Sequence, residues 1–409
     1  MPGMNKRDLQ IRTARALLWW RSRPGPLARL MAKSSCAAPI PQEGKALRVA
    51  AVQVRARLYE RAKDFAGHME ELVREASRGG ASLVVFPEDH GTQLLGILPG
   101  LKHIASETSI AEISGKAEGG MGEILRIISP YAVRIFTKTC AELARAYHVY
   151  LVSGSIRRVS EDNRLVNTSY CYDPDGKLLA RQDKLHLMAT EEEWGHSPGE
   201  ELAVVQGNGF RLAFPICHDA SYYETFRLAL AGGADIVAVQ AADAAAYREW
   251  YARRGIWLRV QETPVYGIAS HLVGDFLGLR FTGRSAIYAP LDISPGGDGI
   301  LAQASSTEME EIVIADLNLE ALSSWRRTNP TVLPVELILR FLPELYQRPR
   351  TNAEGVSVAQ KKNDGNGERG QEELAAEEDE KLPAAAELMT AREADVEEEH
   401  TPSIEDGSE

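Results

Sequence analysis

The chain has 409 residues, 44% of them hydrophobic, and four cysteines, which indicates a reduced, intracellular protein rather than a disulfide scaffold. Its net charge of −12 is uneven, because residues 351–409 contain 18 acidic and 5 basic residues while residues 1–45 contain 2 acidic and 9 basic residues. The remainder is mildly acidic, which argues against binding of a nucleic-acid backbone, and no run of 18 apolar residues predicts a membrane span.

The first 45 residues form a predicted basic arm that is rich in arginine and interrupted by Pro24 and Pro26. We favour a helix that docks on its own domain or on a partner subunit. Two alternatives remain open. One is a mitochondrial transit peptide, and the other is a membrane-surface helix anchored by Trp19 and Trp20. Composition does not choose among them, and cytoplasmic localisation is the default expectation.

Buried strands alternate with amphipathic helices through the middle of the chain. Leu47–Val54 predicts a buried strand, and apolar residues within Phe65–Ala76 recur at helical spacing before Gly79. Further strands are expected at 82–86, 149–155, 210–216, 236–239, 265–273, 284–288 and 311–314, helices at 131–148, 222–231 and 247–262, and a hairpin at 167–184. This alternation predicts an α/β fold in which helices cover the sheets.

Four parts are expected along the chain. Residues 1–45 are the arm, 46–328 one large folded domain, 329–350 a C-terminal extension, and 351–409 an acidic tail. The tail contains no Phe, Trp or Tyr, so it cannot bury enough apolar surface to offset the entropy of ordering. We therefore predict a disordered tail that takes no part in any chemistry.

Three predicted strands end at a reactive side chain: Glu88, Lys184 and Cys217. Sites in α/β sheets collect at the carboxyl ends of strands. A thiol, a carboxylate and an ammonium together suit acyl transfer, in which the thiol attacks a carbonyl, the carboxylate moves protons and the ammonium stabilises an oxyanion. Taken singly, each is more ordinary: a buried inert thiol, as expected for Cys140 and Cys171, a surface carboxylate, or a solvated lysine. The ordered set is the signal.

The sequence resembles the nitrilase superfamily of carbon–nitrogen hydrolases over about residues 46–317. The resemblance rests on these segments, in order: VAAVQV (49–54), LVVFPE (83–88), KLHL (184–187), ICHD (216–219) with Glu224, RVQETPVYGIAS (259–270) and FTGRS (281–285). P-loop, dinucleotide and zinc patterns have no comparable match, and histidine is too scattered for a metal site. No cofactor and no metal are expected.

The resemblance implies a four-layer α-β-β-α sandwich that assembles into homodimers or higher oligomers. It also implies that Cys217 is the nucleophile, Glu88 the general base and Lys184 the oxyanion-stabilising cation. The backbone N–H of His218 would be a second oxyanion donor. Members often have a second glutamate between the lysine and the cysteine, and the spacing to Pro198-Gly199 favours Glu192 over its two neighbours.

A free thiol is mostly protonated near neutral pH, so we expect Glu88 and Lys184 to increase the thiolate fraction of Cys217. Within the superfamily, Cys-x-Asp is typical of amide- and carbamoyl-cleaving members, and this chain has Cys217-His218-Asp219. The expected enzyme therefore hydrolyses an amide-type bond of a small molecule through a Cys thioester. A nitrilase, an acyl transferase and a catalytically inactive scaffold acting through its termini remain alternatives.

The interval between Glu88 and Lys184 is longer than the family suggests, and the excess is expected within residues 93–130. Loops on a rigid scaffold commonly carry specificity, so this insertion is expected to form a lid or an oligomer contact. The substrate itself is not indicated by the sequence.

Overall fold

The computed structural model describes residues 17–22, 46–102, 120–329 and 340. The chain divides into two compact units, Met1–Glu336 and Leu337–Glu409, and all described residues except Arg340 belong to the first. Most of the predicted arm and residues 103–119 of the predicted insertion lie outside the described residues. So do the predicted extension and acidic tail, apart from Asn329 and Arg340.

The described strands form two sheets that are joined where the end of β1 pairs with β9, Val54 opposite Leu272. Neighbouring strands in the first sheet are β13-β1-β2-β3-β4-β5, and in the second they are β12-β11-β9-β8-β7-β6, with β10 paired to β9. The strands of the first sheet are β1 (Leu47–Arg55), β2 (Leu83–Val85), β3 (Tyr150–Val159), β4 (Leu165–Tyr172), β5 (Leu178–Asp183) and β13 (Glu311–Leu317). Those of the second are β6 (Val204–Gln206), β7 (Arg211–Ala213), β8 (Ile236–Ala241), β9 (Tyr266–Phe276), β10 (Leu279–Phe281), β11 (Ala286–Tyr288) and β12 (Ile300–Gln303).

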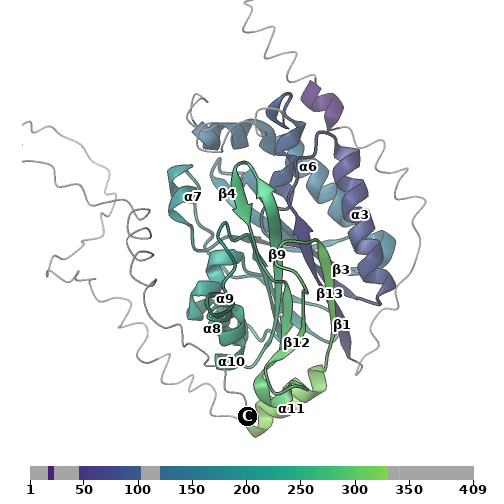
Figure 1. The fold of residues 1–409 in the computed structure, drawn as a ribbon, viewed down its shortest axis with the longest axis vertical. Coiled ribbons are helices and arrows are strands. Elements are labelled where there is room, and N and C mark those ends of the chain that lie inside the picture. The colour runs from purple at the N-terminus through teal and green to yellow at the C-terminus, as the bar shows by residue number, and fades with distance from the viewer. Residues whose placement is uncertain (1–16, 23–45, 103–119, 330–339, 341–409) are drawn as a thin grey trace, which may run out of the picture. The chain divides into compact units, whose positions relative to one another are not determined.

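Helices cover the outer face of each sheet (Figure 1). On the first sheet these are α3 (Ala62–Arg78) and α6 (Gly120–Tyr147), and on the second they are α8 (Tyr223–Ala231) and α10 (Ile256–Glu262). Further helices are η1 (Gly91–Ile97), α7 (Ala189–Glu193), η2 (Cys217–Ser221), α9 (Glu249–Arg253), η3 (Leu291–Ile293) and α11 (Leu319–Thr328). The four-layer α-β-β-α sandwich expected from the resemblance is confirmed.

The layers follow from the alternation of side chains along strands, which places successive residues on opposite faces of a sheet. In β1, Val49 packs in the core between the two sheets, whereas Ala50 packs under the helices α3 and α6. In β8, Ile236 packs between the sheets and Val237 packs under α8 and α10. Because both faces are buried, these strands are continuously apolar, as the sequence indicated.

Two predicted helices differ in extent from those observed. The predicted helix 247–262 is two short helices, α9 and α10, because Gly255 between them has a non-helical ψ of −119°. The predicted helix 131–148 begins earlier, at Gly120, and Pro130 lies inside it. Apolar residues at helical spacing continue on both sides of Pro130 and pack in the core, and this packing outweighs the low helix propensity of proline.

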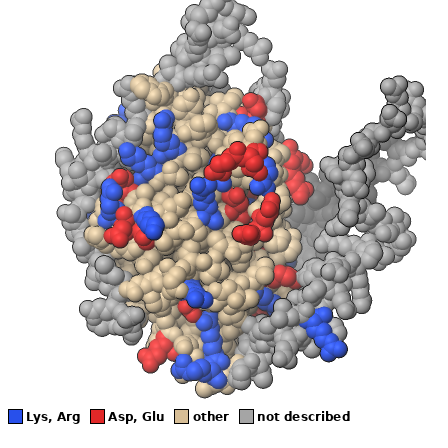
Figure 2. All heavy atoms as spheres, turned by 180° about the vertical axis from the view of Figure 1, so that it is seen from behind, with Lys and Arg blue, Asp and Glu red and all other residues tan. Residues whose placement is uncertain are grey.

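The surface of this unit carries both charges. On the face seen in Figure 2, basic and acidic side chains are interspersed and neither sign covers it, so that face lacks the continuous basic surface that phosphate binding needs. No helix among the described residues is long and apolar enough to cross a membrane. In the described part of the arm, Leu18 is buried in the core under α3 and α6, and Trp19 and Trp20 are exposed.

Candidate active site

The three predicted reactive residues follow strands of both sheets. Glu88 lies three residues after β2 and Lys184 directly after β5, both in the first sheet. Cys217 lies four residues after β7, in the second sheet, and is the first residue of η2. The charges of Glu88 and Lys184 both act on the Cys217 thiol, so the fold brings the three groups together.

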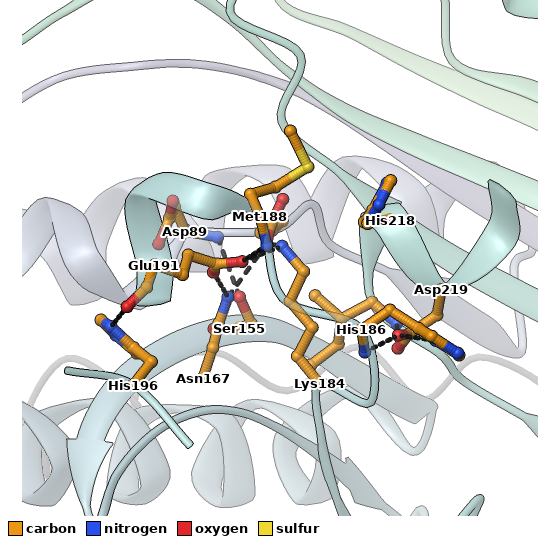
Figure 3. A network of polar contacts seen from close by, with 12 residues as sticks. Asp89, Ser155, Asn167, Lys184, His186, Met188, Glu191, His196, His218 and Asp219 are labelled. Atoms are coloured by element: carbon orange, nitrogen blue, oxygen red, sulfur yellow. Dashed lines mark hydrogen bonds and ion pairs between the residues drawn. The ribbon is translucent and has the colours of Figure 1, made fainter. Parts of the chain in front are cut away.

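Lys184 lies between two buried carboxylates. Its Nζ is 2.8 Å from Oε1 of Glu88 and 2.8 Å from Oε2 of Glu191, and its side chain is 2% exposed. Figure 3 shows Glu191 reaching over to the end of the Lys184 side chain from α7. One cation thus partly neutralises two anions, and these hydrogen-bonded ion pairs offset part of the free-energy cost of burying the three charges.

The second carboxylate of the site is Glu191, which corrects the predicted Glu192. Glu191 is 2% exposed, whereas Glu192 and Glu193 are exposed to solvent. Successive residues of a helix point in directions about 100° apart, so only one of three adjacent glutamates in α7 faces Lys184. The Oε2 atom of Glu191 also accepts a hydrogen bond from the backbone N–H of Met188 at 3.0 Å, which fixes its rotamer.

Three further polar residues that sequence reasoning missed support these carboxylates: Asp89, Arg157 and Asn167. The buried guanidinium of Arg157 donates two hydrogen bonds to Asp89, at 2.9 Å each, and a third to Oε1 of Glu191 at 3.1 Å. The amide of Asn167 donates to Oε1 of Glu88 at 2.9 Å. Arg157 lies beside Arg158 near the end of β3, and this charged residue within a buried strand was the available signal, since a buried arginine requires anionic partners.

The two glutamates have opposite pKa shifts. Burial raises the pKa of Glu88 to about 7, against the effect of Lys184, and the negative charges of Asp89 and Glu191 add to the rise. Burial also opposes ionisation of Glu191, but Arg157 and Lys184 outweigh it and hold the pKa of Glu191 down at about 2. Paired carboxylates with separated pKa values mark one group that titrates and one that stays anionic. Glu88 is therefore suited to proton transfer, and Glu191 to holding Lys184.

The backbone of Cys217 has a φ of 47°, in the left-handed region that a residue with a side chain seldom adopts. Such strain costs on the order of 1–3 kcal/mol and is concentrated at functional sites. Cys217 is partly exposed, whereas Cys140 and Cys171 are buried. The strained turn between β7 and η2 thus presents this one thiol, among the three described, at the surface of the site.

The thiol of Cys217 is neutral at rest, contrary to the expectation of an increased thiolate fraction. Burial and the charges of Glu88 and Asp243 raise its pKa well above the ordinary value, and the opposing effect of Lys184 is smaller. The proton must therefore leave during attack. Lys184, in contrast, stays an ammonium, because the charges of Glu88 and Glu191 outweigh its burial and raise its pKa.

His218 follows Cys217 within η2, where the sequence placed it. Its side chain lies against Ser221 and Tyr222, with Nδ1 3.3 Å from Ser221 Oγ and Nε2 3.4 Å from Tyr222 Oη. The ring of Tyr222 in turn stacks on His186, with centroids 3.8 Å apart. These aromatic side chains lie beside the Cys217 turn.

Comparison with known proteins gives a consistent result. Residues 48–327 match the family model described as carbon-nitrogen hydrolase. A probable hydrolase, YhcX, of Bacillus subtilis (strain 168) is 27% identical over 292 residues, which are 70% of this chain and 52% of that protein. The chain therefore spans about half the length of that relative. A nitrilase of Pyrococcus abyssi is 28% identical over 274 residues, 67% of this chain and 90% of that protein.

The fold is shared with a solved structure, an amidase of the nitrilase superfamily from Nesterenkonia AN1. The TM-score is 0.51 at 22% identity, over 71% of this chain and 99% of that one. A further structure, of a mutant of that amidase, has a TM-score of 0.51 at 21% identity over 72% of this chain and 98% of that one, and shows covalent addition of the acetamide moiety of fluoroacetamide at the active site cysteine. At this identity the likeness establishes the fold.

Proposed function

The chain belongs to the carbon–nitrogen hydrolase family, and from this premise we propose that it hydrolyses an amide-type bond of a small molecule through a thioester on Cys217. The observation that carries the proposal is the buried Glu88–Lys184–Glu191 cluster beside a thiol held on a strained turn. The amidase relative of the same fold, which takes a covalent adduct at its cysteine, supports the same chemistry.

In the first step, the Sγ atom of Cys217 attacks the carbonyl carbon and the thiol proton passes to Glu88, whose pKa near 7 suits it to accept. The negative charge moves to the carbonyl oxygen. Lys184 and the backbone N–H of His218 stabilise it there, since fixed positive groups in a buried site act without reorganising. The neutral resting thiol makes this coupled proton transfer necessary.

The adduct then collapses. Glu88 returns the proton to the leaving nitrogen, the carbon–nitrogen bond breaks, and ammonia or an amine departs from a thioester. Glu88 next removes a proton from water, the hydroxide attacks the thioester carbon, and the carbon–sulfur bond breaks. The proton passes from Glu88 to the thiolate, which restores the free enzyme. Glu191, anionic throughout, keeps the Lys184 ammonium aimed at the carbonyl oxygen.

A panel of small amides, carbamoyl compounds and nitriles tests this function. We expect the wild type to release ammonia from at least one amide or carbamoyl compound, and the folded Cys217→Ala variant to release none. Cys140→Ala is the matched control, because that thiol lies on the buried face of α6 and we expect its loss to leave turnover intact. Turnover by Cys217→Ala equal to that of the wild type would refute the mechanism. Product masses separate an acid from an amide or a transferred acyl group.

The assembly remains a prediction of the family resemblance, and the compartment remains a prediction of the amino-acid composition. We propose a homodimeric unit in the cytoplasm, and sedimentation of the full-length chain tests the first part. Sedimentation of the folded chain as a monomer would contradict the proposed assembly.

A further inference from the structure

The cation and the nucleophile of the site come from strands that do not pair with each other. Lys184 follows β5, and among the described strands β5 pairs with β4 in the first sheet. Cys217 follows β7, which pairs with β6 and β8 in the second sheet. No ladder hydrogen bond between β5 and β7 is found in the described residues, so backbone pairing does not itself fix the position of Lys184 relative to Cys217.

The carboxylate of Asp219 bridges this gap. Its Oδ1 atom accepts hydrogen bonds from the backbone N–H groups of Leu185, at 3.0 Å, and His186, at 2.8 Å. Its Oδ2 atom accepts from the backbone N–H of Ile216 at 2.9 Å. The first two donors directly follow Lys184 and the third directly precedes Cys217. One side chain thus holds the two segments that carry the cation and the nucleophile.

Asp219 is placed for support and not for contact with a substrate. Its side chain is 0% exposed, and the ring Nδ1 of His186 lies 3.0 Å from Oδ1 (Figure 3). Its backbone also belongs to the Cys217 turn, since the N–H of Asp219 donates to the carbonyl of Ile216 and its own carbonyl accepts from Tyr222. Charge-assisted hydrogen bonds to backbone N–H groups are roughly twice as strong as neutral ones.

We propose, on the basis of the function proposed above, that Asp219 is a positioning residue that sets the distance between the Lys184 ammonium and the Cys217 thiol. The aspartate of Cys217-His218-Asp219 then connects the first sheet to the second at the site, and it does not contact the substrate. An error of about 1 Å in such a geometry can cost about 100-fold in rate, so the effect falls on kcat more than on substrate binding.

Asp219→Asn is the nearly isosteric substitution that tests this role. The amide oxygen can still accept from Leu185 and His186, but the amide NH₂ then faces the N–H of Ile216, so the connection to the Cys217 turn is lost. Asp219→Glu keeps the charge and lengthens the connection by one methylene. Asp235→Asn is the control. Asp235 likewise accepts hydrogen bonds from a backbone N–H, that of Arg211, and from a side chain, that of Arg326. It directly precedes β8, however, and so lies at the end of the second sheet that is opposite to Cys217.

Four quantities are measured on each variant: kcat and KM on an amide that the panel shows the wild type to cleave, the pH midpoint of Cys217 alkylation by iodoacetamide, and the melting temperature. For Asp219→Asn we expect kcat to fall about 100-fold with KM within about threefold. We expect the alkylation midpoint to move to higher pH, because Lys184 lowers the pKa of the thiol and is now displaced. Asp235→Asn is expected to lose melting temperature only.

The direction of the alkylation midpoint separates positioning from simple charge. Removal of a negative charge near the thiol would move the midpoint to lower pH, so a downward or absent shift in a folded variant overturns the proposal. Retention of kcat within about threefold overturns it as well. If Asp219→Asn does not fold, Asp219→Glu decides by the same two criteria. If the wild type cleaves no amide, the proposed function fails, but the alkylation shift still decides the role of Asp219.

Discussion

The pH dependence of turnover follows from the environment of Glu88. A carboxyl with a pKa of about 7 is about 1% ionised at pH 5, about half ionised at pH 7 and about 90% ionised at pH 8. Because ionised Glu88 accepts the thiol proton, kcat/KM should rise about 50-fold from pH 5 to pH 7 and level off above pH 8. A glutamate at its ordinary pKa of 4.5 would give less than about a 1.5-fold change over the same interval.

The assay is kcat/KM for ammonia release at half-unit intervals from pH 5 to pH 8.5, because kcat/KM reports the ionisation of the free enzyme. Unfolding curves at each pH confirm that the protein stays folded. A profile that is flat from pH 5 to pH 7 would refute the assignment of Glu88 as the titrating base. A midpoint that stays near 7 after Glu88→Gln, in whatever activity remains, would assign the titration to another group.

Three further predictions concern the buried charges. Glu191→Gln should lower kcat about 100-fold, whereas Glu192→Gln should stay within about twofold, and equal losses in steady-state assays would contradict the placement of Lys184. Arg157→Met should destabilise the fold by about 3–5 kcal/mol in urea titrations at pH 7, because Asp89 and Glu191 lose their partner, and a loss under about 1 kcal/mol would count against it. Folding raises the pKa of Glu88, so the protonated carboxyl contributes to the stability of the fold below the unfolded pKa, and this contribution is lost as pH rises through about 7. Relative to the wild type, Glu88→Gln should therefore raise the free energy of unfolding by about 3 kcal/mol at pH 8 and by less than about 1 kcal/mol at pH 5. An unchanged free energy of unfolding at pH 8 would contradict this prediction.

The sheets were predictable because their strands carry strong local signals. A strand that is buried on both faces carries a continuous apolar run, and such runs occur at 49–52, 149–152 and 236–239, so strand identity does not depend on distant contacts. Glu88, Lys184 and Cys217 were visible as reactive side chains because each follows another predicted strand, namely β2, β5 and β7. The break at Gly255 was not predicted, since the apolar spacing continues across it.

The polar network was only partly predictable, because it depends on tertiary placement. The phase of the single turn α7 decides which of three adjacent glutamates meets Lys184, and one turn is too short for a sequence pattern to fix that phase. Arg157 becomes intelligible only when α7 and the turn after β2 bring Glu191 and Asp89 to it. The role of Asp219 likewise depends on two segments that are about 33 residues apart in sequence.

Mass spectrometry of the enzyme during turnover tests the central claim most directly. When the enzyme is quenched in acid with an amide that it cleaves, peptide mapping should find the acyl group of that amide on Cys217 and not on Cys140 or Cys171. The adduct should disappear as the substrate is consumed, and Cys217→Ala should show none. Full ammonia release with no adduct at any time after quenching, or an adduct on another residue that forms and decays at the rate of turnover, would contradict a thioester mechanism at Cys217.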